Sequence, residues 1–430
     1  MDELFIIKEL KNFLDETGRL KSYPAKFKPK IISLFYLTSK FEPKKRYSEK
    51  EVNEILKSWH MFNDWCMLRR DLYDKRFLGR EQNSSYYWLE DKQPTFADFG
   101  LELLMTKQLV NEQYGLKATN LYRLQMGVGG LTYLVETNSE KYVLKGVSSG
   151  DCYVRNEPEI AIFLKKNGLP VAEYVLTKDN QYLWKYDSNV YHMQRFVEGE
   201  IIPFNKAPDW FMTESAQLLG KIHAVLSGFK QLPTGMGDSF IDFMQSGYAK
   251  ASYEKTLEKA KDIHDINIVT DVEYRLSQVD KLQAIEFDLS KFTCSNTHGD
   301  YKISQIICQS NHIKAVIDWT GACVHPICWE IIRSFTYADS SCETGEIDID
   351  RFIEYIMEYL LYFSLNAYDL KMMPYYFYYQ LLSCDYYGQY YASDNINRGD
   401  FLFQAQFATK LIRWFESNVE DLSKRLFAMV

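Results

Sequence analysis

The chain has 430 residues, of which 46% are hydrophobic and 25% charged, and its formal net charge is −8. This balance is typical of a folded globular protein and excludes a disordered chain. No run of about eighteen uncharged apolar residues is present, and the first residues, MDELFIIKELKNF, lack the apolar core of a signal peptide. Eight cysteines occur without CxxC or metal-ligand spacing, so we expect a cytoplasmic protein with reduced thiols and no membrane contact.

Charge is distributed unevenly along the chain. Residues 21–80 contain 15 Lys and Arg against 7 Asp and Glu, although the whole chain is acidic. A basic segment attached to an acidic body indicates two different kinds of partner. Lysines that only solvate a small helical domain would give the same count, so this alternative stays open.

The basic segment begins with two predicted helices. An apolar run over 31–41 is long enough for the first. Ser48 and Glu51 have the spacing of a capping box, which marks the start of the second. From Val52 onward, apolar residues recur at i, i+3, i+4 and i+7, which predicts one buried helix face.

A third helix and a hairpin complete the segment. In the helix over 63–75, we expect Arg69, Arg70 and Lys75 to point outward. Two short β-prone stretches around 82–85 predict a hairpin. Helix, helix, basic helix and hairpin is the order of a winged helix, whose basic helix would neutralise phosphates in a nucleic-acid groove. Winged helices also serve as protein-contact modules, so the partner is DNA or a protein.

The same segment resembles a small domain of unknown function found in bacterial regulator-like proteins. The resemblance covers about residues 25–90 and is carried by FEPKKRYSEKEVNEIL, LRRDLYDKRFLGRE and YYWLE. It identifies a module but does not by itself indicate nucleic-acid binding.

A strand–turn–strand pattern follows, in NLYRLQMGVGGLTYLVETNSEKYVLKGV. Glycines at 127, 129 and 130 (Gly127, Gly129 and Gly130) would let backbone N–H groups approach an anion without interference from a Cβ. Lys145 alternates with apolar residues in the third strand, and Glu157 stands near the start of the next helix. A glycine turn alone is weak evidence, but its order with the lysine and the glutamate is informative.

This order resembles that of the small lobe of protein kinases. The resemblance implies that Lys145 holds the α- and β-phosphates of a nucleotide and that Glu157 holds Lys145, with Glu159 as an alternative. It also implies that SNVYHMQRFVEGE contains the hinge, where backbone groups near Gln194 and Phe196 would meet the adenine edge.

The stretch THGDYKISQIICQSNHIKAVIDWTGA predicts loop, strand, turn, strand and loop. A hairpin brings its two ends together, so we expect Asp300 and Asp318 to be neighbours, with Gln305 at the start of the first strand. Two carboxylates and an amide oxygen at one place would need a cation between them. Hard oxygen ligands near phosphates favour Mg²⁺.

The sequences H-G-D and I-D-W together resemble aminoglycoside phosphotransferases and choline kinases, which have the protein-kinase-like fold. The resemblance spans roughly 110–430 and is carried by MGVGG, YVLKG, EPEIAIFLKKNGLPV, LLGKIHA, HGDYKISQ and VIDWTGA. It implies transfer of phosphate from ATP, with GTP as the alternative, to a hydroxyl of a small molecule. Asp300 would accept the proton of that hydroxyl, and Asp318 would ligate Mg²⁺ with Gln305.

One position departs from the family pattern. Members of the family usually have asparagine five residues after the aspartate at position 300, whereas this chain has Gln305. The longer side chain puts the second metal ion in doubt. It leaves open an inactive homologue, in which a kinase-like body would sense a ligand and the N-terminal module would act as a regulator.

The C-terminal part is acidic and rich in tyrosine, as in MMPYYFYYQLLSCDYYGQYYASD. These rings would fill a helical core. Alternatively, they would line an acceptor pocket in which Glu330 and Asp339 attract a cationic substrate.

The prediction for the whole chain is therefore an α+β protein. A winged-helix-like module over 1–95 precedes a two-lobed protein-kinase-like domain, with its small lobe over 110–197 and its large lobe over 198–430.

Overall fold

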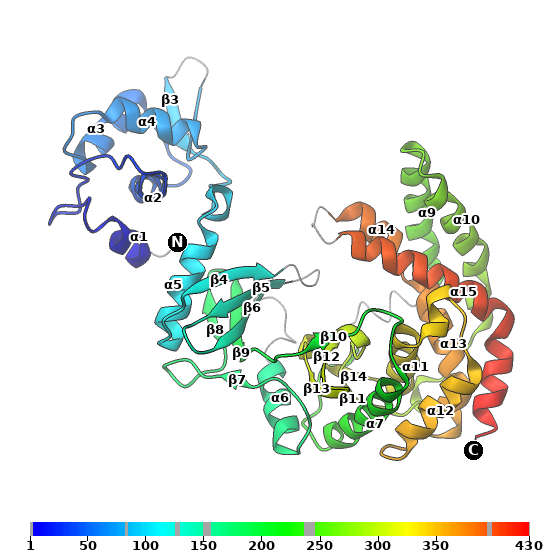
Figure 1. The fold of residues 1–430 in the computed structure, drawn as a ribbon. Coiled ribbons are helices and arrows are strands. Elements are labelled where there is room, and N and C mark those ends of the chain that lie inside the picture. The colour runs from blue at the N-terminus through cyan, green and yellow to red at the C-terminus, as the bar shows by residue number, and fades with distance from the viewer. Residues whose placement is uncertain are drawn as a thin grey trace. The chain divides into compact units, whose positions relative to one another are not determined.

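The computed structural model describes residues 3–81, 85–124, 130–148, 156–235, 246–393 and 398–429. The chain divides into two compact units, Met1–Tyr122 and Arg123–Val430. Figure 1 shows the elements of both units.

The first unit is mainly helical and contains a small antiparallel sheet with strand order β1-β3-β2. Its described elements are α1 (Glu3–Leu10), α2 (Phe27–Thr38), β1 (Arg46–Ser48), α3 (Glu49–Trp59), α4 (Trp65–Asp74), β2 (Leu78–Arg80), β3 (Tyr86–Leu89), the 3-10 helix η1 (Ala97–Phe99) and α5 (Glu102–Tyr114). The unit extends to Tyr122, beyond the end of the module predicted at residue 95.

The local predictions for α3 are confirmed. Ser48 accepts a hydrogen bond from the backbone N–H of Glu51, and the Glu51 carboxylate accepts one from the Ser48 N–H, which completes the capping box. Val52 and Leu56 are fully buried in the core of this unit. The i, i+4 spacing therefore identified the face that packs inward.

A six-stranded sheet opens the second unit, and its first strand, β4, begins before the division at Arg123. Its order is β4-β5-β6-β9-β7, and β8 also pairs with β9. The strands are β4 (Asn120–Leu124), β5 (Gly130–Glu136), β6 (Lys141–Ser148), β7 (Tyr174–Val175), β8 (Trp184–Tyr186) and β9 (Asn189–Arg195), and α6 (Glu157–Lys166) follows β6 in the chain. The antiparallel register places Lys145 on β6 opposite Thr132 on β5 and His192 on β9.

The rest of the second unit contains two small sheets and most of its helices. The sheets are β10 (Glu200–Ile201), β12 (Ile306–Gln309) and β13 (His312–Val316) in the order β10-β12-β13, and β11 (Cys294–Thr297) with β14 (Cys323–Pro326). The helices are α7 (Asp209–Leu226), α9 (Ser246–Asp262), α10 (Ile266–Val279), α11 (Ile327–Ala338), α12 (Ile349–Leu360), α13 (Ala367–Ser383), α14 (Tyr386–Ala392) and α15 (Arg398–Phe427), with 3-10 turns η3 (Asp280–Ala284), η4 (Leu289–Lys291), η5 (Ile303–Gln305), η6 (Trp319–Gly321) and η7 (Ser340–Thr344). In Figure 1 the small sheets lie between the six-stranded sheet and helices α11 to α15.

Aromatic side chains fill the core of the helical part. Tyr376, Tyr378 and Tyr387, from the tyrosine-rich stretch, are at most 4% exposed. Arg275 on α10 is also fully buried, and its guanidinium donates to the Tyr253 hydroxyl at 2.8 Å and to the Ala405 carbonyl at 2.8 Å. The prediction that the tyrosine-rich stretch forms a core is therefore confirmed for these three tyrosines.

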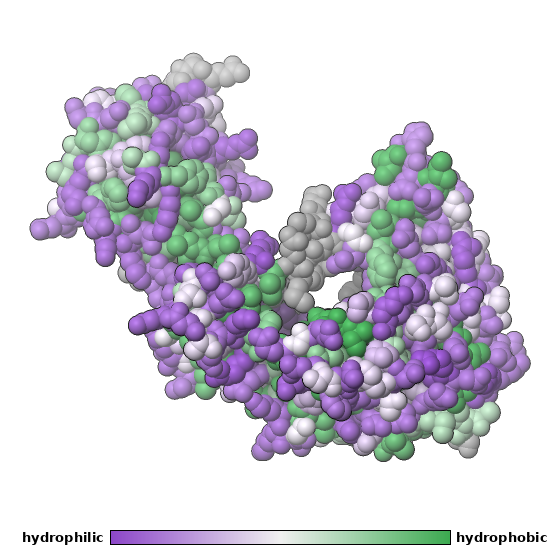
Figure 2. Space-filling view, viewed as in Figure 1, coloured by the Kyte–Doolittle hydropathy of each residue, from purple (hydrophilic) through white to green (hydrophobic). Residues whose placement is uncertain are grey.

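None of the helices in the described ranges is both long and apolar enough to cross a membrane. The surface in Figure 2 is mostly hydrophilic. One apolar tip lies between α9 and α10, where Ile263 and Ile266 are 57% and 76% exposed.

Candidate functional site

A hairpin brings the two aspartates of the sequence motif together, as predicted. Strands β12 and β13 pair in antiparallel fashion through a turn at Ser310 and Asn311, both of which have positive φ. That turn geometry matches the twist of the flanking strands and fixes the register. Asp300 precedes β12 and Asp318 follows β13.

The side chain of Gln305 connects the two carboxylates. Its Nε2 donates to Asp300 Oδ2 at 3.0 Å and to Asp318 Oδ2 at 3.3 Å. The Thr320 hydroxyl donates to Asp318 Oδ1 at 2.7 Å. In this state the amide faces the carboxylates with its nitrogen, which offsets part of their mutual repulsion.

Lys145 joins the sheet to this hairpin. Its Nζ contacts Asp318 Oδ1 and lies 3.6 Å from Glu157 Oε1. Burial alone would lower the pKa of Lys145, but the two carboxylates outweigh it and raise the pKa. Glu159 instead reaches the surface, where it pairs with Lys230. The structure therefore places Glu157, and not its alternative, beside the lysine.

Glu157 is fully buried among polar groups, of which sequence reasoning missed His192 and Tyr174. His192 Nε2 lies 3.0 Å from its Oε2, although the two atoms are not aligned as a hydrogen bond. Gln194 Nε2 lies 3.5 Å from its Oε1 and donates to the Tyr174 hydroxyl at 2.7 Å. Burial would raise the pKa of Glu157, but the positive charge of Lys145 and the imidazole outweigh it and hold the pKa well below its ordinary value.

The hinge prediction needs correction. The Gln194 side chain packs behind Glu157, as just described, and does not reach outward. The Phe196 N–H donates to the Lys141 carbonyl at 3.0 Å, so it completes the sheet and is not free for adenine. Gln194 lies within β9, opposite Val143 on β6 and Tyr174 on β7, and Phe196 directly follows the last residue of the strand.

Two cations flank Asp300, and neither was predicted. Arg333 Nη2 lies 2.6 Å from Oδ1, and Lys302 Nζ lies 3.0 Å from Oδ2. Burial would raise the pKa of the Asp300 carboxyl, but Arg333, Lys302 and the Gln305 amide outweigh burial and hold the pKa below its usual range. Lys302 stands two positions after Asp300 and could have been noticed. Arg333 comes from α11, and no local pattern pointed to it.

Glu330 on α11 supports the loop that carries Asp300. Its carboxylate accepts the backbone N–H groups of His298 at 3.1 Å and Tyr301 at 3.2 Å, and it lies 2.9 Å from His223 Nε2. Glu330 is fully buried. The prediction that Glu330 attracts a substrate is therefore wrong, because its carboxylate is enclosed by the protein's own donors.

The same correction applies to Asp339. This residue is fully buried at the end of α11. Its Oδ2 accepts from Arg351 Nε at 2.9 Å, and its Oδ1 accepts from the Ser341 N–H at 3.0 Å. These contacts cap a helical turn. They leave neither carboxylate oxygen of Asp339 free to bind the substrate that accepts the phosphate.

A glycine contact holds the two sequence motifs together. Gly299, between His298 and Asp300, has a φ of +77°. A Cβ at that position would lie only 1.8 Å from the carbonyl oxygen of Gly321. Glycine is therefore required here both by the backbone conformation and by the close approach of the second loop.

The glycine turn of the sheet is described only in part. Gly127 and Gly129 lie outside the described residues. Gly130 is the first residue of β5 and pairs with Val147. A Cβ on Gly130 would lie 3.3 Å from the Gly146 carbonyl oxygen, so this glycine favours close strand pairing.

In the first unit, the predicted outward-facing basic residues of α4 behave differently from one another. Arg70 and Lys75 are exposed. The Arg69 side chain is only 16% exposed and its Nη1 lies 2.8 Å from Glu49 Oε1. The prediction that Arg69 points freely outward is therefore wrong, because it ties α4 to α3.

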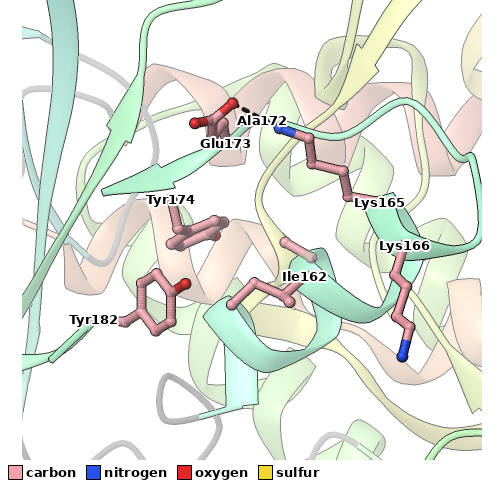
Figure 3. Close-up of a pocket in the computed structure, with 8 residues that line it drawn as sticks. Ile162, Lys165, Lys166, Ala172, Glu173, Tyr174 and Tyr182 are labelled. Carbon is pink, nitrogen blue, oxygen red and sulfur yellow. Dashed lines mark hydrogen bonds and ion pairs between the residues drawn. The ribbon is translucent and has the colours of Figure 1, made fainter. Parts of the chain in front are cut away.

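Two cavities among the described residues are not lined by any of the predicted site residues. One, of about 350 Å³, lies between α6 and β7, with Tyr174 and Tyr182 on one wall and the ion pair of Lys165 and Glu173 nearby (Figure 3). The other, of about 500 Å³, is lined mainly by residues of α15, including Phe403. The candidate site is defined by converging charged groups and not by either cavity.

Comparison with known proteins agrees with this geometry. Residues 121–360 match the model of the phosphotransferase enzyme family, and residues 19–89 match a family described as uncharacterized proteins conserved in bacteria. No curated protein matches the chain.

Solved structures show the same fold. A spectinomycin phosphotransferase in complex with ADP and spectinomycin is 14% identical, with a TM-score of 0.50, covering 75% of this chain and 98% of its own. An aminoglycoside phosphotransferase from Alicyclobacillus acidocaldarius subsp. acidocaldarius DSM 446 is also 14% identical, with a TM-score of 0.50, covering 74% and 96%. The predicted protein-kinase-like fold is confirmed. Since the family match spans more than half of its residues, this chain belongs to the phosphotransferase enzyme family.

Proposed function

We propose that the second unit transfers the γ-phosphoryl group of ATP to a hydroxyl of a small molecule. The observation that supports this most directly is the chain of contacts from Glu157 through Lys145 and Asp318 to Gln305 and Asp300. These contacts bring Lys145, a cation that can bind phosphates, close to Asp300, a carboxylate that can accept a proton. Phosphoryl transfer needs this arrangement.

In the proposed reaction, Lys145 binds the α- and β-phosphates. The acceptor hydroxyl approaches Asp300 and gives up its proton to that carboxylate as its oxygen attacks the γ-phosphorus. The bond between that phosphorus and the β,γ-bridging oxygen breaks, and the products are ADP and a phosphate monoester. The low pKa of Asp300 keeps its carboxylate ionised and ready to accept at neutral pH.

The residues present fit Mg²⁺. Asp318 offers a carboxylate and Gln305 an amide oxygen once its amide turns over, and Mg²⁺ needs few protein ligands because nucleotide phosphates and water complete its shell. When bound, the ion would neutralise charge on the phosphates. Lys145, which contacts Asp318 in the present state, is placed to move its amine towards those phosphates.

The test is an assay of ADP release with a broad panel of hydroxyl compounds, in which phosphorylated products are identified by ³¹P NMR. We expect Asp300→Asn to lower kcat by about 100- to 10,000-fold, the usual contribution of a positioned base. Its affinity for ATP should change little, because Asp300 faces the acceptor. Equal product formation by wild type and Asp300→Asn would contradict the proposal.

A second candidate function concerns the first unit. From α2 to β3 its elements are a helix, a strand, two helices and two strands, and this order, with sheet order β1-β3-β2, supports the winged-helix interpretation. Arg70 on α4 and Lys75, directly after that helix, are exposed, so we infer that they contact nucleic-acid phosphates. This would make the chain a regulator, whether or not the second unit catalyses phosphate transfer.

Salt-dependent binding to duplex DNA tests this second candidate. The double variant Arg70→Glu, Lys75→Glu should bind more weakly and with a smaller salt slope than wild type. Lys21→Glu, which changes an exposed lysine outside α4, serves as the control. If both variants bind like wild type, or nothing binds at low salt, this role for α4 is excluded.

A further inference from the structure

The charge around Asp300 bears on the chemistry of the acceptor. The two acids that would have favoured a cationic acceptor, Glu330 and Asp339, are fully buried and bonded to the protein's own donors. The groups that do lie beside the Asp300 carboxylate are the cations Lys302 and Arg333. An ammonium group next to the reacting hydroxyl would be repelled by them.

Arg333 has hydrogen-bonding capacity that the protein does not use. Its Nη2 binds Asp300, whereas its Nη1 makes no aligned hydrogen bond among the described residues and is shielded from solvent, although the Tyr337 hydroxyl interacts with the guanidinium. A buried N–H group without a partner is costly, and such a group in a native site calls for an explanation. The simplest is a ligand oxygen that reaches the guanidinium when the acceptor binds.

The surroundings of Arg333 hold its guanidinium in place. It lies over the Trp329 ring at 5.2 Å and over the Tyr337 ring at 4.8 Å. Burial would lower its pKa, but Asp300 outweighs burial and raises the pKa. Two aromatic faces and one carboxylate thus fix a charged, planar donor beside the position of the reacting hydroxyl.

The site remains accessible on the side of the carboxylate. The side chains of Asp300, Lys302 and Arg333 are 28%, 22% and 12% exposed. Two cations face the Asp300 carboxylate, whereas the Asp318 carboxylate on the other side of Gln305 is paired with Lys145. The cationic donors therefore lie on the Asp300 side, where they can bind an anion.

We propose that Arg333 binds an anionic group, a carboxylate or a phosphate, that the acceptor carries close to its reacting hydroxyl. The inference rests on the proposed phosphotransfer and specifies its substrate class. Arg333 then determines specificity, and Asp300 remains the group that accepts the proton. Acceptors of this kind are hydroxy acids or phosphorylated alcohols, in contrast to amino alcohols.

The test compares acceptors of one length, such as 3-hydroxypropanoate, 3-amino-1-propanol and 1,3-propanediol, together with longer hydroxy acids, glycerol phosphate and glycerol. Wild type should show kcat/KM at least about ten times higher for the acid than for the amine of the same skeleton, since one charge-assisted hydrogen bond changes binding by roughly that much or more. Comparison of the hydroxy acids with glycerol phosphate shows whether the bound anion is a carboxylate or a phosphate. A preference for amines overturns the inference.

Variants at position 333 supply the second readout. Arg333→Met should lower kcat/KM for the preferred anionic acceptor by about 10- to 100-fold, with a much smaller change for the diol. Arg333→Lys should restore part of the loss, because it keeps the charge. Equal losses for all acceptors would show that Arg333 only positions Asp300, and would overturn the inference.

Arg413→Met is the matched control. Arg413 also lies over a tyrosine ring, that of Tyr274 at 3.8 Å, and pairs with an aspartate, Asp271, at 3.5 Å. It contacts none of the site residues, so its replacement should leave the acceptor preference unchanged.

Binding of the same compounds, measured by calorimetry with a non-hydrolysable ATP analogue and Mg²⁺, separates this inference from the proposed function. Asp300→Asn removes the negative charge next to Arg333 and should tighten anion binding several-fold while abolishing transfer. If no acceptor is phosphorylated yet hydroxy acids bind selectively and depend on Arg333, the proposed function fails and the anion site stands. If no anion binds selectively to wild type or to Asp300→Asn, the inference is overturned, whether or not the enzyme phosphorylates any acceptor.

Discussion

The carboxylate of Glu330 accepts the backbone N–H of Tyr301 at 3.2 Å, and through this bond α11 holds the loop on which Asp300 stands. Glu330→Gln replaces one acceptor oxygen by a donor, which cannot bind a backbone N–H. We expect kcat to fall at least about tenfold, because a small displacement of a catalytic group is costly. Stability should fall by about 1–3 kcal/mol, the usual cost of an unsatisfied buried polar group. Steady-state kinetics and urea unfolding measure the two effects.

Glu420→Gln is the control for this change. Glu420 is 72% exposed on α15 and pairs with Lys424 on the same helix. Its replacement should alter stability by less than about 0.5 kcal/mol. Full activity in Glu330→Gln would mean that the loop holds its position without α11.

Glu157 and Glu159 offer a test within one helix. Glu157→Gln removes the buried negative charge 3.6 Å from Lys145 and leaves the amine held by Asp318 alone. We expect the KM for ATP to rise and kcat to fall, together by about 10- to 100-fold in kcat/KM, since the lysine loses the group that orients it.

Glu159→Gln should leave both constants near wild type, because Glu159 pairs with Lys230 at the surface. Steady-state kinetics with varied ATP distinguishes the two variants. If they behave alike, the ion pair of Lys145 and Glu157 has no part in nucleotide binding.

Gln305→Asn tests the departure from the family pattern. The substitution shortens the side chain by one methylene, about 1.5 Å, and so removes the amide from its positions 3.0 Å from Asp300 and 3.3 Å from Asp318. We expect a higher Mg²⁺ requirement and a lower kcat, because the backbone of this chain is arranged for the longer side chain. Rates measured over a range of Mg²⁺ concentrations check this. A faster enzyme with asparagine would indicate instead that glutamine weakens the site.

The parts of the fold and of the site that sequence predicted are those close together in the chain. The capping box of Ser48 and Glu51 and the hairpin between Asp300 and Asp318 depend on short spacings and turn residues, which a single sequence displays. Glu330 and Tyr301 are 29 positions apart, and nothing local shows that they meet.

The predictions that needed correction failed because burial cannot be read from the sequence. The sequence shows that Glu330 and Asp339 carry charge but not that both are enclosed, and charge alone suggested a substrate contact. Likewise, the helical position of Arg69 does not reveal its pairing with Glu49. Whether a charged side chain is free or paired depends on partners from distant segments. Those partners become known only with the tertiary fold.

Acid should destabilise the second unit through His325. This histidine is 4% exposed, with its Nε2 3.4 Å from the Tyr376 hydroxyl. Burial lowers the pKa of His325 to about 4, although Glu330 acts in the opposite direction. The unfolded chain has a histidine pKa of about 6.5, so between pH 6.5 and 4 it binds a proton that the folded chain does not. Stability therefore falls as the pH is lowered through that window, by about 1.4 kcal/mol per pH unit and roughly 3 kcal/mol in all, and not further below it.

Urea unfolding at pH 7 and pH 5, followed by tryptophan fluorescence, measures this dependence, since the Trp329 ring lies 4.9 Å from His325. His325→Gln should lose about 2 kcal/mol less than wild type between these two pH values, because glutamine does not titrate. His264→Gln, which changes an exposed histidine, should keep the wild-type dependence. If His325→Gln loses as much stability as wild type on acidification, His325 does not stay neutral in the folded protein, and the acid sensitivity arises from other groups.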